Sequence, residues 1–247
     1  MRNIPHVLVV AGSDSSGGAG IVRDIETLAA FGVKASVAIT AVTVQTHHGV
    51  QGVDAVAPER VAQQMRAALS ANPIAAVKIG MLATPATIAA VAQILVDHPD
   101  IPVVLDPVLV STSGRALLTP DATDALRDLF RACTLVTPNL PELSVLAAST
   151  VASSPDSVAG QARSLLMAGA KAVLVKGGHA GGVEAIDLLV QPEHADQSFA
   201  SPRLAASMRG TGCMLASAIA ARLAFGDPLA AAIARAKAFV HGKFRET

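Results

Sequence analysis

Short apolar runs alternate along the chain with longer segments of helical composition. The apolar runs predict strands at residues 6–11, 34–40, 76–79, 102–105, 135–137, 172–175 and 185–190. Helices are predicted near residues 18–30, 59–71, 85–97, 121–132, 141–148 and 156–168, with two more after Gly212 and Pro228. This alternation predicts an α/β fold with a mostly parallel sheet and helices on both sides. The carboxyl ends of its strands would lie along one edge, where ligands usually bind.

No linker, low-complexity tract or internal repeat interrupts these elements. The most loop-like regions, residues 148–157 and 191–202, are too short to separate domains. A single domain over residues 1–247 is therefore expected.

Composition narrows the class of protein. Hydrophobic residues make up 51% of the 247 residues and charged residues only 15%, so a large buried core is expected. Lys+Arg and Asp+Glu number 19 each, a balance that gives no electrostatic footprint for nucleic acid or an anionic membrane. The two cysteines are too few for a disulfide scaffold or a zinc cluster. Without a signal-peptide core or a membrane span, the chain is expected to be cytoplasmic.

Residues 210–213, Gly-Thr-Gly-Cys, stand directly before an alanine-rich segment with strong helix-forming composition. The first amides of a helix have no partner within it, and glycines leave them uncovered, so Gly210, Thr211 and Gly212 predict an anion site. Cys213 would lie in the same field, where we expect the pKa of its thiol to be lowered. An anion site with a base or nucleophile inside it suggests phosphoryl transfer. The alternative is a glycine-rich turn followed by a core cysteine.

Polar residues follow several of the predicted strands. Asp106 comes after four apolar residues, and a buried carboxylate there would need a partner such as Mg²⁺. Asn139 and Glu142 have the spacing of a helix capping box, and they could also reach a phosphate and Mg²⁺. Lys176 is a candidate point charge for nucleotide phosphates, or a surface lysine before a hairpin turn.

A glycine-rich loop at residues 12–20 joins the first strand to a helix. Gly18-Ala19 occupies the place where a P-loop needs Lys-Ser/Thr, and Arg23 replaces the third small residue of a dinucleotide fingerprint. The loop therefore suits close approach of backbone to a compact ligand. The Gln45 amide can donate and accept at once, which suits a ring nitrogen beside an exocyclic amine. Met81 could pack against a small ring or fill a core gap.

Taken together and in order, seven segments closely resemble the hydroxymethylpyrimidine/phosphomethylpyrimidine kinases of thiamine biosynthesis, in the ribokinase-like superfamily. The resemblance covers nearly the whole chain. Its segments are residues 11–20, 40–45, 78–82, 105–108, 137–142, 176–179 and 210–213.

The resemblance implies a three-layer α/β/α domain and ATP-dependent, Mg²⁺-assisted phosphorylation of 4-amino-5-hydroxymethyl-2-methylpyrimidine and then of its monophosphate. It implies that Gln45 binds the aminopyrimidine edge and that Cys213 is the base. The pocket around the ring would be lined by Gly12, Ala19, Met81 and Val108. Mg²⁺ and the ATP phosphates would be bound by Asp106, Asn139, Glu142 and Lys176. The anion hole would be formed by Gly210, Thr211 and Gly212. Members are often homodimers.

Three features depart from the usual pattern of the family. Thr46-His47 follows Gln45 where Asn-Thr is usual, and Arg209 precedes the glycine motif where His is common. The sequence stops at Thr247, whereas relatives often continue through a glycine-rich tail. We expect such changes to alter nucleotide affinity or the second phosphorylation without removing the chemistry.

Two other functions fit many of the same residues. A pyridoxal or pyridoxine kinase on the same scaffold would differ mainly around Gln45. A non-catalytic pyrimidine-binding module would bind the ligand without turnover. A dinucleotide oxidoreductase is disfavoured because its glycine fingerprint fails.

Overall fold

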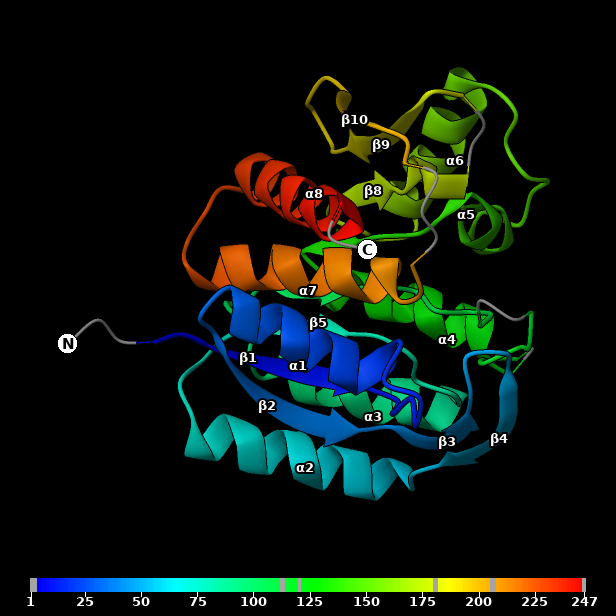
Figure 1. Cartoon of the computed structure of the whole chain (residues 1–247). Coiled ribbons are helices and arrows are strands. Elements are labelled where there is room, and N and C mark those ends of the chain that lie inside the picture. The colour runs from blue at the N-terminus through cyan, green and yellow to red at the C-terminus, as the bar shows by residue number, and fades with distance from the viewer. Residues whose placement is uncertain (1–3, 112–113, 120, 180–181, 205–207, 246–247) are drawn as a thin grey trace.

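A mostly parallel sheet runs through the middle of the structure, a computed structural model that describes residues 4–111, 114–119, 121–179, 182–204 and 208–245 (Figure 1). Its spatial order, within these residues, is β10-β9-β8-β7-β6-β5-β1-β2. The strands are β1 (His6–Ala11), β2 (Lys34–Ile39), β5 (Ile74–Ile79), β6 (Val103–Leu105), β7 (Leu135–Val136), β8 (Val173–Val175), β9 (Glu184–Val190) and β10 (Gln197–Pro202).

The order of the strands reverses beside β1. The chain passes from β1 to β2 on one side and later returns to β5 on the other side. All pairs from β2 to β8 are parallel, whereas β9 and β10 are antiparallel to their neighbours. In open α/β sheets, ligands bind outside the carboxyl ends of the strands at such a reversal. The predicted α/β architecture is confirmed.

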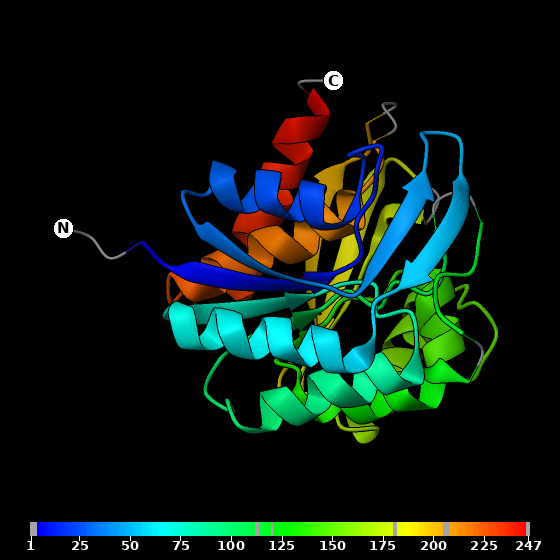
Figure 2. The same cartoon turned by 90° about the horizontal axis from the view of Figure 1, so that it is seen from below.

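Helices cover both faces of the sheet, because strand side chains alternate between two hydrophobic clusters. In β1, Leu8 and Val10 belong to one cluster, and Val7 and Val9 belong to the other. One face carries α1 (Gly20–Ala30), α7 (Thr211–Ala224) and α8 (Leu229–Arg245), above the sheet in Figure 2. The other face carries α2 (Pro58–Ala71), α3 (Pro85–Val96), α4 (Ala122–Leu129), α5 (Leu140–Leu146) and α6 (Pro155–Met167).

A second, two-stranded sheet extends past the end of β2. It consists of β3 (Ala41–Gln45) and β4 (Val50–Ala55), which are antiparallel. The strand predicted at residues 34–40 therefore ends at Ile39, and the chain turns at Thr40 into the separate β3. Thr40 holds this corner, since its N–H donates to Ala11 and its hydroxyl donates to the Met81 carbonyl over 2.6 Å.

Three strands were absent from the sequence-based prediction, namely the separate β3 and two others. The region 191–202 was interpreted as a loop, but it contains β10, and β4 was not predicted at all. Both segments are largely polar or half-exposed and lie at sheet edges. Such strands lack the apolar run that identifies a central strand.

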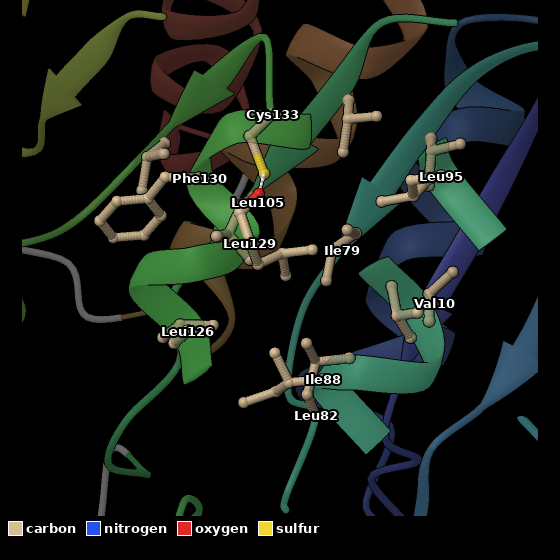
Figure 3. Close-up of a cluster of buried hydrophobic side chains, with 14 of the residues drawn as sticks. Val10, Ile79, Leu82, Ile88, Leu95, Leu105, Leu126, Leu129, Phe130 and Cys133 are labelled. Atoms are coloured by element: carbon tan, nitrogen blue, oxygen red, sulfur yellow. Dashed lines mark hydrogen bonds between the residues drawn. The ribbon is translucent and has the colours of Figure 1, made fainter. Parts of the chain in front are cut away.

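The core beneath the helical layer of α3 and α4 contains one of the two cysteines (Figure 3). The Cys133 thiol is buried and donates to the Leu129 carbonyl over 3.3 Å. Burial raises the pKa of this thiol to about 12. Cys133 is therefore a packing residue. Among the described residues, no helix combines the length and the apolar character needed to cross a membrane.

Candidate functional site

A cavity of about 780 Å³ opens at the carboxyl edge of the sheet and follows it from β1 to β9. Every site residue predicted from the sequence lines it. These residues are Gly12, Ala19, Gln45, Met81, Asp106, Val108, Asn139, Glu142, Lys176, Gly210, Thr211, Gly212 and Cys213. They come together because the parallel strands end at the same edge.

The first turn of α7 points uncovered amides into this cavity. Gly210 is the N-cap, with φ at 72°, and a Cβ there would collide with the Gly18 carbonyl oxygen. The first helical bond from this cap runs from the Met214 N–H to the Gly210 carbonyl. The amides of Thr211, Gly212 and Cys213 precede that bond, so they lack partners within the helix. Together with the helix dipole they favour an anion.

Three charged groups meet beside these amides. Lys176 Nζ lies 2.6 Å from Asp106 Oδ1 and 3.7 Å from Glu142 Oε2. A Cβ on Gly212 would lie 3.2 Å from Lys176 Nζ and 3.4 Å from Asp106 Oδ2, so α7 begins directly against this cluster. Burial lowers the pKa of Lys176, but the charges of Asp106 and Glu142 outweigh that effect and raise it. The ammonium therefore persists at neutral pH.

Asn139 and Glu142 form the predicted capping box at the start of α5. The Glu142 N–H donates to Asn139 Oδ1 and the Asn139 N–H donates to Glu142 Oε2, each over 2.8 Å. Burial raises the pKa of Glu142 to about 7, and the charge of Asp106 adds to this, although Lys176 acts in the opposite direction. Glu142 therefore caps α5 and also lines the cavity, where a cation would stabilise its ionised carboxylate.

Replacing Glu142 with glutamine is expected to stabilise the protein at pH 8 by up to about 3 kcal/mol. The pKa of Glu142 rises from an ordinary 4.5 to about 7, so ionisation is costlier in the folded state. That cost is small at pH 4.5, where the unfolded carboxyl begins to ionise, grows as the pH rises, and is nearly complete above pH 7. Urea unfolding of both proteins at pH 4.5 and pH 8 measures it. Glu193→Gln, at an exposed position, is the control and should show no such difference. Equal stability of wild type and Glu142→Gln at pH 8 would contradict the expectation.

The predicted lowering of the Cys213 pKa is wrong. Burial of the sulfur raises its pKa to about 11, and the nearby charges of Asp24 and Asp106 act in the same direction. The Lys78 ammonium and the Gly20 N–H lower it, but by less. Desolvation of the sulfur is the largest of these effects, and it outweighs the positive end of the helix. The resting thiol is therefore protonated at neutral pH.

The β3 end of the cavity, defined by Gly12, Gln45, Met81 and Val108, is compact and mostly apolar. Met81 packs with Ala41 and Val108, and a Cβ on Gly12 would lie 3.1 Å from the Met81 sulfur. Gln45 Nε2 donates to Asp14 Oδ2 over 3.2 Å. A carboxylate only accepts, so this contact fixes which end of the amide faces Asp14. Gln45 Oε1 accepts from the Thr43 hydroxyl over 3.4 Å, so its second lone pair and the remaining Nε2 N–H stay available to a flat ring.

The other end of the cavity, called here the α8 end, lies at the β9–β10 end of the strand order. It is defined by Ala185, Asp187, Ser201, Lys237 and Val240. Asp187 accepts from Lys237 over 2.6 Å and from the Gly177 N–H over 2.9 Å. This buried ion pair fastens α8 to β9.

Several site residues escaped the sequence reasoning. Asp14, Asp187 and Lys237 line the cavity, as does the fully buried Lys78. Lys78 Nζ lies 2.8 Å from Asp24 in the interior behind Cys213. For Lys78, Asp187 and Lys237, the available signal was a charged residue inside an apolar strand or helix, because such a charge requires a partner. Asp14 lies in the glycine-rich loop and carries no such signal.

No group of three or more His, Cys, Asp or Glu side chains suited to a metal ion occurs in the described part of the chain. Asp106 and Glu142 nevertheless flank Lys176 on the cavity wall. Mg²⁺ is commonly held by one or two carboxylates together with substrate phosphates and water. The pair fits that mode of binding rather than an all-protein site.

The family model and the curated relatives indicate one family, and the similar solved structures include pyridoxal kinases as well. The family model of phosphomethylpyrimidine kinase matches residues 14–247. The chain is 45% identical over 235 residues to the hydroxymethylpyrimidine/phosphomethylpyrimidine kinase of Rhizobium meliloti, covering 95% of this chain and 88% of the relative. The crystal structure of phosphomethylpyrimidine kinase from Clostridium difficile is similar, with a TM-score of 0.84, 33% identity, and 98% and 99% of the two chains covered. Pyridoxal kinase from Staphylococcus aureus in complex with pyridoxal has a TM-score of 0.88 and 30% identity, covering 97% of this chain and 87% of that one.

Proposed function

The chain belongs to the phosphomethylpyrimidine kinase family and acts as an ATP-dependent hydroxymethylpyrimidine/phosphomethylpyrimidine kinase of thiamine biosynthesis, and we propose that its reaction takes place in the cavity at the carboxyl edge of the sheet. The observation that carries this proposal is the arrangement around the first turn of α7. Its uncovered amides, the Cys213 thiol and the Asp106–Lys176–Glu142 cluster all line one cavity with two chemically different ends.

The aminopyrimidine binds at the β3 end. Gln45 presents a carbonyl oxygen and one N–H, which match an exocyclic amine and the adjacent ring nitrogen. Asp14 orients this amide by accepting from Nε2. Met81 and Val108 supply apolar contact for the ring, in a chain that contains no Trp or Tyr.

ATP binds from the α8 end, with its γ-phosphate at the first turn of α7. Lys176 contributes a charge beside that turn, and the uncovered amides of Gly212 and Cys213 donate to phosphate oxygens as charge develops. These groups are positioned before substrate arrives, so they need little reorganisation during transfer. Cys213, in its thiolate form, accepts the proton of the attacking hydroxymethyl group.

Mg²⁺ is held by Asp106 and Glu142 together with the ATP phosphates. When bound, it neutralises the developing charge on the transferred phosphoryl group. The raised pKa of Glu142, caused by burial and by the charge of Asp106, supports this assignment, because a bound divalent cation would stabilise the ionised carboxylate.

Product analysis tests the proposed function directly. The protein is incubated with ATP, Mg²⁺ and free 4-amino-5-hydroxymethyl-2-methylpyrimidine, and the products are separated over time. We expect the monophosphate to appear first and the diphosphate to follow. Ligand binding without ATP consumption would instead indicate a non-catalytic pyrimidine-binding module.

Pyridoxal is the competing acceptor, because the pyridoxal kinase of S. aureus shares the fold at a TM-score of 0.88. Competition between the two acceptors in a coupled ATP-consumption assay distinguishes them. The pairing of Gln45 with Asp14 favours the aminopyrimidine, so we expect the larger kcat/KM for that acceptor.

A further inference from the structure

The guanidinium of Arg209 reaches the β3 end of the cavity from the loop before α7. Its Nη1 donates to Ser16 Oγ and to the Thr46 carbonyl, each over 3.1 Å. Its Nη2 lies 3.3 Å from Asp14 Oδ2. Arg209 therefore bridges the glycine-rich loop, the end of β3 and the loop that precedes the α7 amides.

The ion pair of Arg209 is looser than those of three other cations that line the cavity. Lys78 lies 2.8 Å from its carboxylate partner, and Lys176 and Lys237 each lie 2.6 Å from theirs. The Arg209 side chain is also partly exposed, with 22% of its surface accessible.

Asp14 does not depend on Arg209 for its hydrogen bonds. Its Oδ1 accepts from the Ser16 N–H over 2.9 Å and from Ser16 Oγ over 2.7 Å. Its Oδ2 also accepts from Gln45 Nε2. Movement of the guanidinium away from Asp14 would therefore leave this buried carboxylate with three donors.

On the basis of the proposed function, we propose that Arg209 binds the phosphate of the monophosphorylated acceptor and thereby determines how well the enzyme carries out its second phosphorylation. The free alcohol is uncharged on its hydroxymethyl arm, whereas the monophosphate brings a dianion into the β3 end. A guanidinium binds phosphate through two parallel hydrogen bonds and exchanges a long contact to Asp14 for shorter ones. Arg209 discriminates between the two acceptors because only one carries this group.

The test is the ratio of kcat/KM for the monophosphate to kcat/KM for the free alcohol. In Arg209→Gln, which removes the charge, we expect the ratio to fall by about 10- to 100-fold. Arg209→Lys keeps the charge but loses the two parallel N–H donors of the guanidinium, so its ratio should lie between those of wild type and Arg209→Gln. Asp14→Asn removes the competing negative charge, so the ratio should rise. Asp14→Asn also disturbs the orientation of the Gln45 amide. Because Gln45 contacts the ring of both acceptors, this disturbance lowers both kcat/KM values equally and cancels in the ratio.

Ionic strength gives a second measurement that loss of structure would not imitate. Added salt should raise the KM for the monophosphate in the wild type, and this dependence should be weaker in Arg209→Gln. A ratio that stays constant across the variants while both activities fall would overturn the proposal. Arg209 would then have only a structural role, in holding the loops together. A wild-type protein that phosphorylates neither acceptor would instead refute the proposed function, and this proposal with it.

Discussion

Replacing Cys213 with alanine is expected to lower kcat by about 10²- to 10⁴-fold, the usual contribution of a general base. Burial raises the pKa of Cys213 to about 11, so the thiolate is a minor species at neutral pH. Its fraction grows about tenfold for each pH unit below the pKa, and kcat of the wild type should rise accordingly between pH 7 and pH 10. Cys213→Ala should lose this rise. The measurement is kcat against pH, at saturating ATP and acceptor.

Cys133→Ala is the matched control for that experiment. The same atoms are removed, but Cys133 lies in the core beneath α3 and α4 and does not line the cavity. This variant should lose some stability, because it leaves a small void, and keep the pH dependence of kcat. A Cys213→Ala protein with wild-type kcat and the same pH profile would remove Cys213 from the role of base.

Adding a methyl group to Gly212 is expected to lower kcat by about 10²- to 10³-fold, as the loss of a preorganised donor does. In Gly212→Ala, the new Cβ lies 3.2 Å from Lys176 Nζ and 3.4 Å from Asp106 Oδ2. It therefore displaces the charged cluster and covers the amides that bind the transferred phosphate. Steady-state kinetics with varied ATP, at saturating acceptor, should show the loss in kcat and therefore also in kcat/KM for ATP.

Gly160→Ala provides the comparison within another helix. Gly160 lies in α6, and a Cβ there would meet nothing within 4 Å among the described atoms. This substitution should leave kinetics unchanged and stabilise the protein by about 0.5–1 kcal/mol. If Gly212→Ala behaves like Gly160→Ala, the first turn of α7 does not bind the phosphate.

Most of the fold could be predicted from local sequence because its central strands are short apolar runs. Residues 6–11 match β1 in full, and the predicted helix at 156–168 differs from α6 by one residue at each end. The strands β4 and β10 were missed for a related reason. An edge strand has one strand neighbour and can remain polar, so β10 lacks the apolar signature that identified β1.

Many residues of the site could also be predicted from the sequence, because ligand-binding residues follow the carboxyl ends of parallel strands. Asp106 and Lys176 each follow a buried strand, and parallel strands present their carboxyl ends at one edge. Contacts between the glycine-rich loop and β3 were not accessible. Asp14 meets Gln45 across 31 positions of sequence, and Arg209 reaches Asp14 across 195.

The sequence by itself determined the layered architecture, the family and many of the residues that face the cavity, since these follow from periodicity, strand ends and ordered motifs. It did not identify Asp14, Lys78, Asp187 or Lys237 as cavity residues. Only the tertiary structure decided the chemical state of those residues. Cys213 stands at a helix N-terminus, which by itself would lower the pKa of its thiol, yet that pKa is raised. The reason is physical: desolvation and the charges of Asp24 and Asp106 come from segments far away in the chain, and no local pattern records them.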